Sequence, residues 1–341
     1  MMTGIRTIVR AATFLFTVTS LVLFYQSTGL AQELKLAHFM SPKHPMDKSM
    51  MSPWAAEVAK LSNSSLTVRI YPGGELGKGP QEQFKRAVDG IADITFGLQG
   101  YTSKQFPRTT LIELPAVAAD AIEATNKMWD VFDKHLVVEY QRVKVLALWG
   151  NEGPLLMSRD KPIRKINDLK GMKVRVPSKD QADLIVALGA TPVSMPASDM
   201  YRGLSTGVVD ALMVPATVIS SFKIGEVAKY YTTGLVFGRS PFFLAMNKRT
   251  YDGLSKEHKA IIDKTTGRSL SLVGAKVYEE EGAKDLDGVR KSGNHEVIAF
   301  SPEEAKKGNA LLVKARDQIV ARLEKEGVPA KAILAAMSAA N

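Results

Sequence analysis

Two periodicities of hydrophobic residues alternate along most of this chain. Short apolar runs with a spacing of two predict β-strands, at residues 34–39, 66–71, 92–96, 143–149, 154–157, 173–176, 192–195 and 210–214. Between them, apolar residues three and four positions apart predict helices, at residues 47–61, 80–89, 121–140, 181–188 and 199–205. Because strands and helices alternate, the pattern favours an α/β fold.

The pattern becomes mainly helical after Tyr251, over residues 256–289 and again from Ser301 onward. Ser301 is followed by Pro302 and two glutamates, which is a strong helix start with a serine cap. Lys and Glu alternate there with Ala and Leu, as in helices that pack one face on a scaffold. The C-terminal part is therefore expected to support the fold.

The N-terminus has the features of a signal peptide. Arg6 and Arg10 precede an apolar run at residues 11–24, and Gly29-Leu30-Ala31 forms a small-x-small cleavage site. We therefore expect residues 1–31 to be removed, so that the mature chain begins at Gln32 in the periplasm. The apolar run is short for a membrane span, which needs about 20 residues; an uncleaved anchor is the alternative.

Composition narrows the function classes further. Removal of 31 residues from 341 leaves 310, enough for two lobes with a cleft between them. Cysteine is absent, which excludes disulfides, thiolate metal sites, a cysteine nucleophile and a lipid anchor on cysteine. The net charge of +10 falls to +8 without Arg6 and Arg10. Basic and acidic residues are interspersed, so we expect a field that attracts anions and no nucleic-acid partner.

Arg175 is the most informative single residue. In residues 173–177 (KVRVP), Val174 and Val176 can face a core while Arg175 projects to the other side, near the C-terminal end of the strand. Small ligands bind at that end of strands in open α/β folds. The guanidinium fork suits a carboxylate. A solvated arginine at a sheet edge is the alternative.

Three candidate motifs for catalysis, phosphate binding or metal binding lack the order or spacing that such sites need. Residues 203–207 match G-x-S-x-G, but a helix precedes Ser205 and a strand follows it, the reverse of a hydrolase elbow. The glycine-rich residues 73–79 lack the spacing of a phosphate loop. His38 and His44 do not have the spacing of a helical metal site. We therefore predict no enzyme activity, no catalytic residue, no metal and no cofactor.

Several segments in order resemble the solute receptors of TRAP transporters, the extracytoplasmic proteins that deliver carboxylates to a sodium-driven permease. The similarity covers nearly all of the chain after the leader, at residues 34–39, 66–77, 90–97, 168–177, 189–211 and 241–248. It implies a two-lobed periplasmic binding protein (class II-like) with mixed sheets, crossing strands and long C-terminal helices that brace both lobes. The expected division is 32–150 mainly lobe 1, 151–245 mainly lobe 2 and 246–341 the helical segment, with lobes discontinuous in sequence.

The same resemblance implies a set of ligand-binding residues. Arg175 matches the arginine that clamps the substrate carboxylate, and Ser178 stands where the family often has a polar contact. Asn151, after Trp149, falls in a connection that borders the cleft. Core packing is the alternative for the apolar members. The implied pocket residues beyond these are Phe39, Tyr101, Met195 and Phe237.

Departures from the family pattern predict the ligand. Val214 stands where many relatives have asparagine, Ala197 where many have phenylalanine, and Pro154 where some have a second arginine. We therefore expect a monocarboxylate with an aromatic or branched tail, such as a 2-oxo or hydroxy acid, delivered to membrane permease subunits. A ligand-presenting sensor subunit and a secreted hydrolase are the alternative functions.

Overall fold

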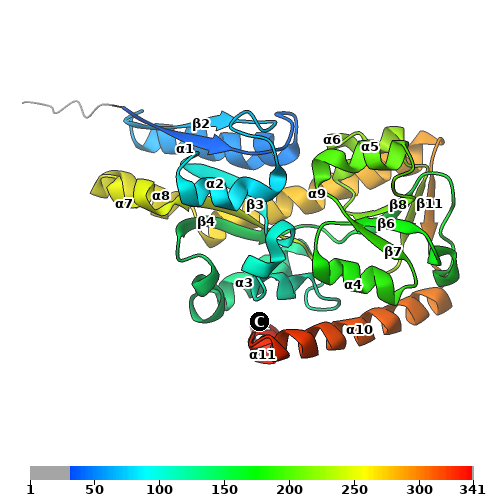
Figure 1. Cartoon of the computed structure of the whole chain (residues 1–341). Helices are drawn as coiled ribbons and strands as arrows, with labels where there is room; N and C mark the ends of the chain where they lie inside the picture. Colours follow the sequence, from blue (N-terminus) through cyan, green and yellow to red (C-terminus); the bar gives the residue numbers. More distant parts are fainter. Residues whose placement is uncertain (1–30, 340–341) are drawn as a thin grey trace, which may run out of the picture. The chain divides into compact units, whose positions relative to one another are not determined.

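Two mixed β-sheets organise the fold in this computed structural model, which describes residues 31–339 (Figure 1). The predicted signal peptide lies outside the described residues, apart from Ala31. The first sheet has the order β2 (Leu66–Tyr71), β1 (Gln32–Ala37), β3 (Ile94–Leu98), β10 (Pro241–Asn247) and β4 (Val143–Gly150). The second has the order β11 (Glu296–Ala299), β9 (Tyr230–Thr233), β5 (Leu155–Ser158), β8 (Ala211–Val214), β6 (Lys173–Val176) and β7 (Thr191–Ser194).

Each sheet combines parallel and antiparallel pairs. In the first sheet β1 is parallel to β2 and β3, whereas β10 runs antiparallel to β3 and β4. In the second, β6 is parallel to β7 and β8, β11 is parallel to β9, and β5 is antiparallel to β8 and β9. The predicted α/β class with mixed sheets is confirmed.

Helices pack on both sheets, and the long C-terminal helices contact elements that belong to both. In chain order the α-helices are α1 (Ser52–Leu61), α2 (Gln83–Asp89), α3 (Ala121–Asp130), α4 (Lys179–Ala187), α5 (Met200–Ser205), α6 (Val218–Ser221), α7 (Lys248–Gly253), α8 (Lys256–Thr265), α9 (Arg268–Ser292), α10 (Pro302–Lys325) and α11 (Ala330–Ala339). Helix α9 contacts β4 of the first sheet and β11 of the second, while α10 lies along α4 and α11 packs on α3 (Figure 1). The predicted long C-terminal helices are confirmed.

Two extended segments carry the chain between the sheets. Residues 151–154 connect β4 to β5, and residues 234–240 connect β9 back to β10. They are hydrogen-bonded to each other: the Asn151 N–H donates to the Ser240 carbonyl oxygen (3.1 Å), and the Ser240 N–H donates to Asn151 Oδ1 (2.8 Å). The crossing strands are therefore confirmed. Strand β10 belongs to the first sheet although it follows the second sheet's strands in sequence.

The predicted elements agree with the structure except at a few places. Every strand predicted from periodicity is found within two residues of its expected bounds, and β10 falls in the resemblance segment 241–248. Strands β9 and β11, with four residues each, were not predicted. The α-helical part of residues 121–140 ends at Asp130. A π-helical turn, Phe132–Leu136, and a 3₁₀ turn, Val137–Glu139, follow it. The stretch 256–289 is broken at Gly267, whose φ of +79° is a conformation that glycine adopts without strain.

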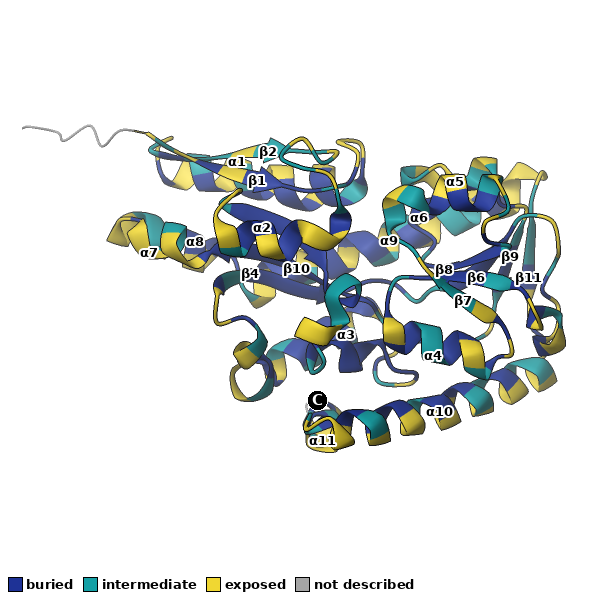
Figure 2. Cartoon of the chain, in the orientation of Figure 1, coloured by how far each residue is buried: buried dark blue, intermediate teal, exposed yellow. Residues whose placement is uncertain are grey.

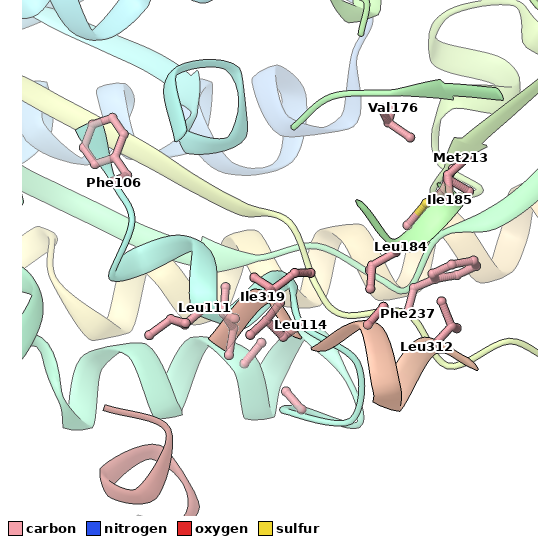
Figure 3. Packing of buried hydrophobic residues seen from close by; sticks show 14 of the residues in the cluster. Phe106, Leu111, Leu114, Val176, Leu184, Ile185, Met213, Phe237, Leu312 and Ile319 are labelled. Atoms are coloured by element: carbon pink, nitrogen blue, oxygen red, sulfur yellow. The ribbon is translucent and has the colours of Figure 1, made fainter. Parts of the chain in front are cut away.

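Apolar side chains form three buried clusters, one of which contains residues of both sheets. One buried cluster joins the turn at Thr109–Glu113, β6, β8, α4 and α10, with Leu111, Val176, Met213, Leu184 and Leu312 among its members (Figure 3). The strands of both sheets are mainly buried, whereas the helices are exposed along one side (Figure 2). Within residues 31–339 no helix combines the length and apolarity needed to span a membrane.

Candidate ligand-binding cavity

A cavity lies between the two sheets and draws its walls from both. Its empty space, including the open mouth, is about 590 Å³. The lining residues are Phe39, Met40, His44, Leu98, Tyr101, Asn151, Pro154, Arg175, Pro177, Gln181, Ala197, Met200, Met213, Val214, Pro215, Thr217, Val218, Phe222, Ser240, Phe242 and Tyr278.

Arg175 is buried in the wall of this cavity. It lies on β6, an internal strand, with Val174 and Val176 facing the core and only 3% of its own surface exposed. This placement excludes the alternative of a solvated arginine at a sheet edge. Its Nε donates to the Met195 carbonyl oxygen (2.8 Å), which holds the side chain in place and leaves the two terminal nitrogens for other partners.

Among residues 31–339, no carboxylate acts on Arg175. Burial lowers the pKa of Arg175, and the one side chain that opposes this shift is Tyr101. The Tyr101 hydroxyl also accepts a hydrogen bond from the Ala197 N–H (2.8 Å). A buried cation without an anionic partner is costly, so the site is suited to an anion supplied from outside.

Most polar groups in the cavity wall are already paired with protein. Gln181 Nε2 donates to Ser240 Oγ (2.8 Å), and Asn151 Oδ1 accepts from the Ser240 N–H. The Thr217 N–H donates to Glu152 Oε1 (2.9 Å), and the Thr217 hydroxyl donates to the same oxygen. These pairings leave few hydrogen-bonding groups for a ligand away from Arg175.

Aromatic and aliphatic side chains make up most of the remaining wall. The Phe39 ring lies 5.5 Å from that of Phe96 and 6.2 Å from that of Tyr101, measured between ring centroids. Phe242 stacks on Trp149 at 6.0 Å with 22° between the ring planes. Tilted, edge-on and stacked ring pairs of this kind are favourable beyond the area that they bury, so aromatic packing stabilises this part of the wall.

Six of the residues predicted for the site line the cavity together. They come from six separate parts of the chain and are Phe39, Tyr101, Asn151, Arg175, Ala197 and Val214. Pro154, used in the ligand prediction, lines it as well. The sequence therefore predicted residues that the fold brings to one place, although their contacts with a ligand stay a prediction.

The other four predicted residues do not line the cavity. Trp149 is fully buried behind Phe242. Ser178 caps α4, where its Oγ accepts from the Gln181 N–H (3.3 Å) and donates to Glu113 Oε2 (2.5 Å). Met195 contributes its carbonyl oxygen to Arg175, and Phe237 belongs to the core cluster with Leu312 (Figure 3). Their places beneath the wall suggest supporting roles.

Sequence reasoning missed several lining residues. His44, considered only as a metal ligand, forms part of the wall together with Gln181, Thr217, Phe222 and Tyr278. Helical spacing places Tyr278 on a buried face of α9, but it does not show which buried residues border an empty space. A metal is not supported either: residues 31–339 contain no cluster of three potential ligands among His, Asp and Glu.

Two buried carboxyl groups lie behind the cavity wall and are shifted toward their neutral forms. Burial raises the pKa of Glu113, which contacts Ser178, to about 8. Burial also raises the pKa of Glu152, which contacts Thr217 of the wall, to about 7. Glu113 is therefore mainly protonated at neutral pH.

The hydrolase alternative finds no support in the geometry around Ser205. This residue ends α5, and β8 follows it, so the order of helix and strand is the reverse of a nucleophile elbow. Its hydroxyl donates to the Arg202 carbonyl oxygen (3.1 Å) in the preceding turn. The motif is a helix end.

A cavity between two mixed sheets, joined by crossing segments and containing a buried unpaired arginine, defines a solute-binding protein of the periplasmic type. The chain belongs to the DctP family, described as bacterial extracellular solute-binding protein, family 7, whose model matches residues 36–322. Members of this family are non-catalytic TRAP receptors that act in the periplasm and bind small carboxylates.

Three comparisons place the chain within that family. It is 25% identical, over 92% of its length and 94% of the relative's, to the C4-dicarboxylate-binding periplasmic protein DctP of Rhodobacter capsulatus. A TRAP solute binding protein from Rhodoferax ferrireducens T118, solved with copurified benzoate, is 28% identical, with 90% and 97% coverage and a TM-score of 0.86. A marine metagenome protein specific for aromatic acids, solved with 3-hydroxybenzoate, is 27% identical, with the same coverage and TM-score.

Proposed function

We propose that this cavity binds a monocarboxylate with an aromatic or branched tail, such as a 2-oxo or hydroxy acid. The protein then delivers this ligand to the membrane permease of a TRAP transporter. The observation that carries the proposal is the combination of one buried arginine with a mainly apolar wall. Arg175 is the only Lys or Arg among the described residues of that wall.

A single cation limits the number of carboxylates that the cavity can compensate. The carboxylate of a monoacid can accept hydrogen bonds from both terminal nitrogens of Arg175. A second carboxylate at the other end of the ligand would be buried among apolar side chains such as Val218 and Phe222 without a cation. Leaving a buried charge unpaired is strongly unfavourable, so a dicarboxylate should bind more weakly.

The tail of the ligand meets mainly apolar surface. Val214, Ala197 and Pro154, where relatives have bulkier or polar groups, all line the cavity. A sugar acid would bury several hydroxyls among groups that are already paired, at about 1–3 kcal/mol for each unsatisfied group. An aromatic or branched tail instead gains about 25 cal/mol for each Å² of apolar surface removed from water.

Similar proteins support the proposal that the ligand is an aromatic acid. The receptors solved with benzoate and with 3-hydroxybenzoate have the same fold as this chain at 27–28% identity. The R. capsulatus relative is named for C4-dicarboxylates and represents the competing specificity. The absence of a second Lys or Arg from the described cavity wall favours the monocarboxylate.

Isothermal titration calorimetry with a panel of acids tests the proposal. Benzoate, phenylpyruvate and 4-methyl-2-oxopentanoate should bind more tightly than succinate and galacturonate. Val214→Asn should narrow the difference, because it adds a hydrogen-bonding group to the wall. Val208→Asn is the matched control, since Val208 is 53% exposed and does not line the cavity. Tighter binding of succinate or galacturonate by the wild type would refute the proposed ligand class.

Delivery to a permease requires a separate test. In cells that lack the gene, uptake of the radiolabelled acid that binds best should fall. The wild-type gene should restore it, whereas the gene for Arg175→Ala should not. Unchanged uptake in the deletion strain would contradict the transport role and favour presentation of the ligand to a sensor.

A further inference from the structure

A buried histidine forms part of the cavity wall where the loop after β1 meets α6 and α9. His44 is 3% exposed, and its Nδ1 accepts a hydrogen bond from the Met46 N–H (3.2 Å). An imidazole nitrogen that accepts a hydrogen bond carries no proton, so the proton of the neutral ring is on Nε2. Nε2 is therefore the donor of this side chain.

The Nε2 donor is not used by the protein. Within residues 31–339, no hydrogen bond engages His44 Nε2, and it is not among the fully enclosed polar atoms that lack a partner. It therefore reaches empty space, and His44 borders the cavity. An N–H that faces a mainly apolar cavity gains from any acceptor that a ligand brings there.

Charge on His44 is suppressed by its surroundings. Burial and, as a smaller effect, the neighbouring His38 together lower the pKa of His44 to about 3. The groups that pack around it are the uncharged rings of Phe222, 5.8 Å away between centroids, and Tyr278, 6.4 Å away. His38 is itself hydrogen-bonded to Asp47 (3.0 Å) and has a lowered pKa. His44 thus supplies a donor without a positive charge.

Tyr278 adds a hydroxyl to the same part of the wall. It is 3% exposed on α9, and no hydrogen bond within the described residues engages its oxygen. Burial raises its pKa well above the ordinary value, so the hydroxyl stays protonated. Phe242, at 5.2 Å between centroids, completes the aromatic surroundings. The two polar groups are thus set in an otherwise apolar pocket.

Arg175 and this pair of residues face the same cavity, since Arg175, Tyr101, His44 and Tyr278 all line it. They reach it from different elements: Arg175 lies on β6 of the second sheet, His44 follows β1 of the first sheet, and Tyr278 lies on α9. A ligand whose carboxylate binds Arg175 can therefore extend through the cavity toward His44.

We propose that His44 and Tyr278 form a second subsite, which recognises a neutral hydrogen-bond acceptor on the tail of the bound carboxylate. The inference rests on the proposed function and specifies its substrate class: an aromatic acid that carries a hydroxyl or carbonyl group away from the carboxylate. The acceptor is neutral because His44 supplies no charge to balance a second anion. A plain hydrocarbon tail leaves both polar groups unpaired.

Matched acids that differ in one group test the subsite by calorimetry. The probes are 3- and 4-hydroxybenzoate, the 3- and 4-methylbenzoates of nearly equal shape, and terephthalate. Pairing a buried donor with an acceptor should favour the better hydroxybenzoate over its methyl analogue about tenfold. Terephthalate should bind more weakly than both the hydroxybenzoates and the methylbenzoates. The preference should be the same at pH 5.5 and pH 8, because His44 stays neutral.

Substitutions identify the groups responsible. His44→Phe keeps an aromatic ring and removes the donor, so the preference for the hydroxy acid should fall below about threefold. His44→Gln replaces the donor near the position of Nε2 and should restore part of the preference. Tyr278→Phe removes only the hydroxyl, gives a second measurement if His44→Phe does not fold, and should also reduce the preference.

The outcomes separate this inference from the proposed function. If none of these acids binds, or if Arg175→Ala binds them as well as the wild type, the proposed function itself fails. If the acids bind through Arg175 but the hydroxyl gives no advantage, only the subsite is overturned. The subsite is also overturned if the preference for the hydroxy acid persists in both His44→Phe and Tyr278→Phe. Terephthalate binding more tightly than the other acids would overturn it as well.

Discussion

Removal of the Arg175 guanidinium should abolish most of the binding affinity without damaging the fold. Arg175→Met replaces a buried cation by an unbranched apolar side chain, and Arg175→Ala truncates it. Because no carboxylate among the described residues partners Arg175, neither variant leaves an anion unpaired. We therefore expect the unfolding temperature of ligand-free Arg175→Met to be unchanged or higher than that of the wild type.

The size of the affinity loss follows from the hydrogen bonds that remain available. Nε is committed to Met195, so at most the two terminal nitrogens of Arg175 can pair with a ligand carboxylate. Charged hydrogen bonds contribute about 1.5–3 kcal/mol each, which corresponds to about two to four orders of magnitude in Kd for the pair. Arg175→Lys should recover only part of this, because one ammonium cannot replace the fork.

Calorimetry with benzoate, supported by thermal shift, measures the effect. Arg202→Ala is the matched control: it removes the same charge from an exposed position on α5 and should change Kd by less than about threefold. The reasoning would be refuted by an Arg175→Ala variant that is folded and binds benzoate with the wild-type Kd. A loss of equal size in Arg202→Ala would instead indicate a general effect of net charge.

Three further results are expected. Burial raises the pKa of Glu113 to about 8, so the folded state keeps a proton that the unfolded chain loses near the ordinary carboxyl pKa. The stability that this retained proton contributes is lost as the pH rises through about 8. Urea unfolding from pH 6.5 to pH 9 should therefore show a smaller decline for Glu113→Gln, and parallel declines would contradict the shift. Ser178→Ala removes the cap of α4 and the partner of Glu113, which should lower the unfolding free energy by about 1–3 kcal/mol; an unchanged urea midpoint would show that the cap is dispensable. X-ray scattering should show a smaller radius of gyration with saturating benzoate, because a cavity that encloses its ligand must open to load it, whereas identical profiles would indicate a rigid pocket.

Local patterns in the sequence were enough for most of the strands and for the one arginine of the described cavity wall. Alternation over residues 173–176 places Val174 and Val176 on one face and Arg175 on the other, and a buried strand allows no other arrangement. The short strands β9 and β11 were not predicted, since four residues with polar members give little periodicity. They form because each pairs with the other along the edge of the second sheet.

Only the tertiary structure decided which side chains border the cavity. Trp149 and Asn151 are two residues apart, yet Asn151 lines the cavity and Trp149 is packed behind it, because the strand ends between them. His44 and Tyr278 lie on distant segments that meet only when α9 packs between the sheets. Periodicity in a sequence reports which face of one element is buried. Whether that face meets a packed core or an empty space depends on other elements, and this is why the sequence predicted Arg175 in the cavity wall but not His44 and Tyr278.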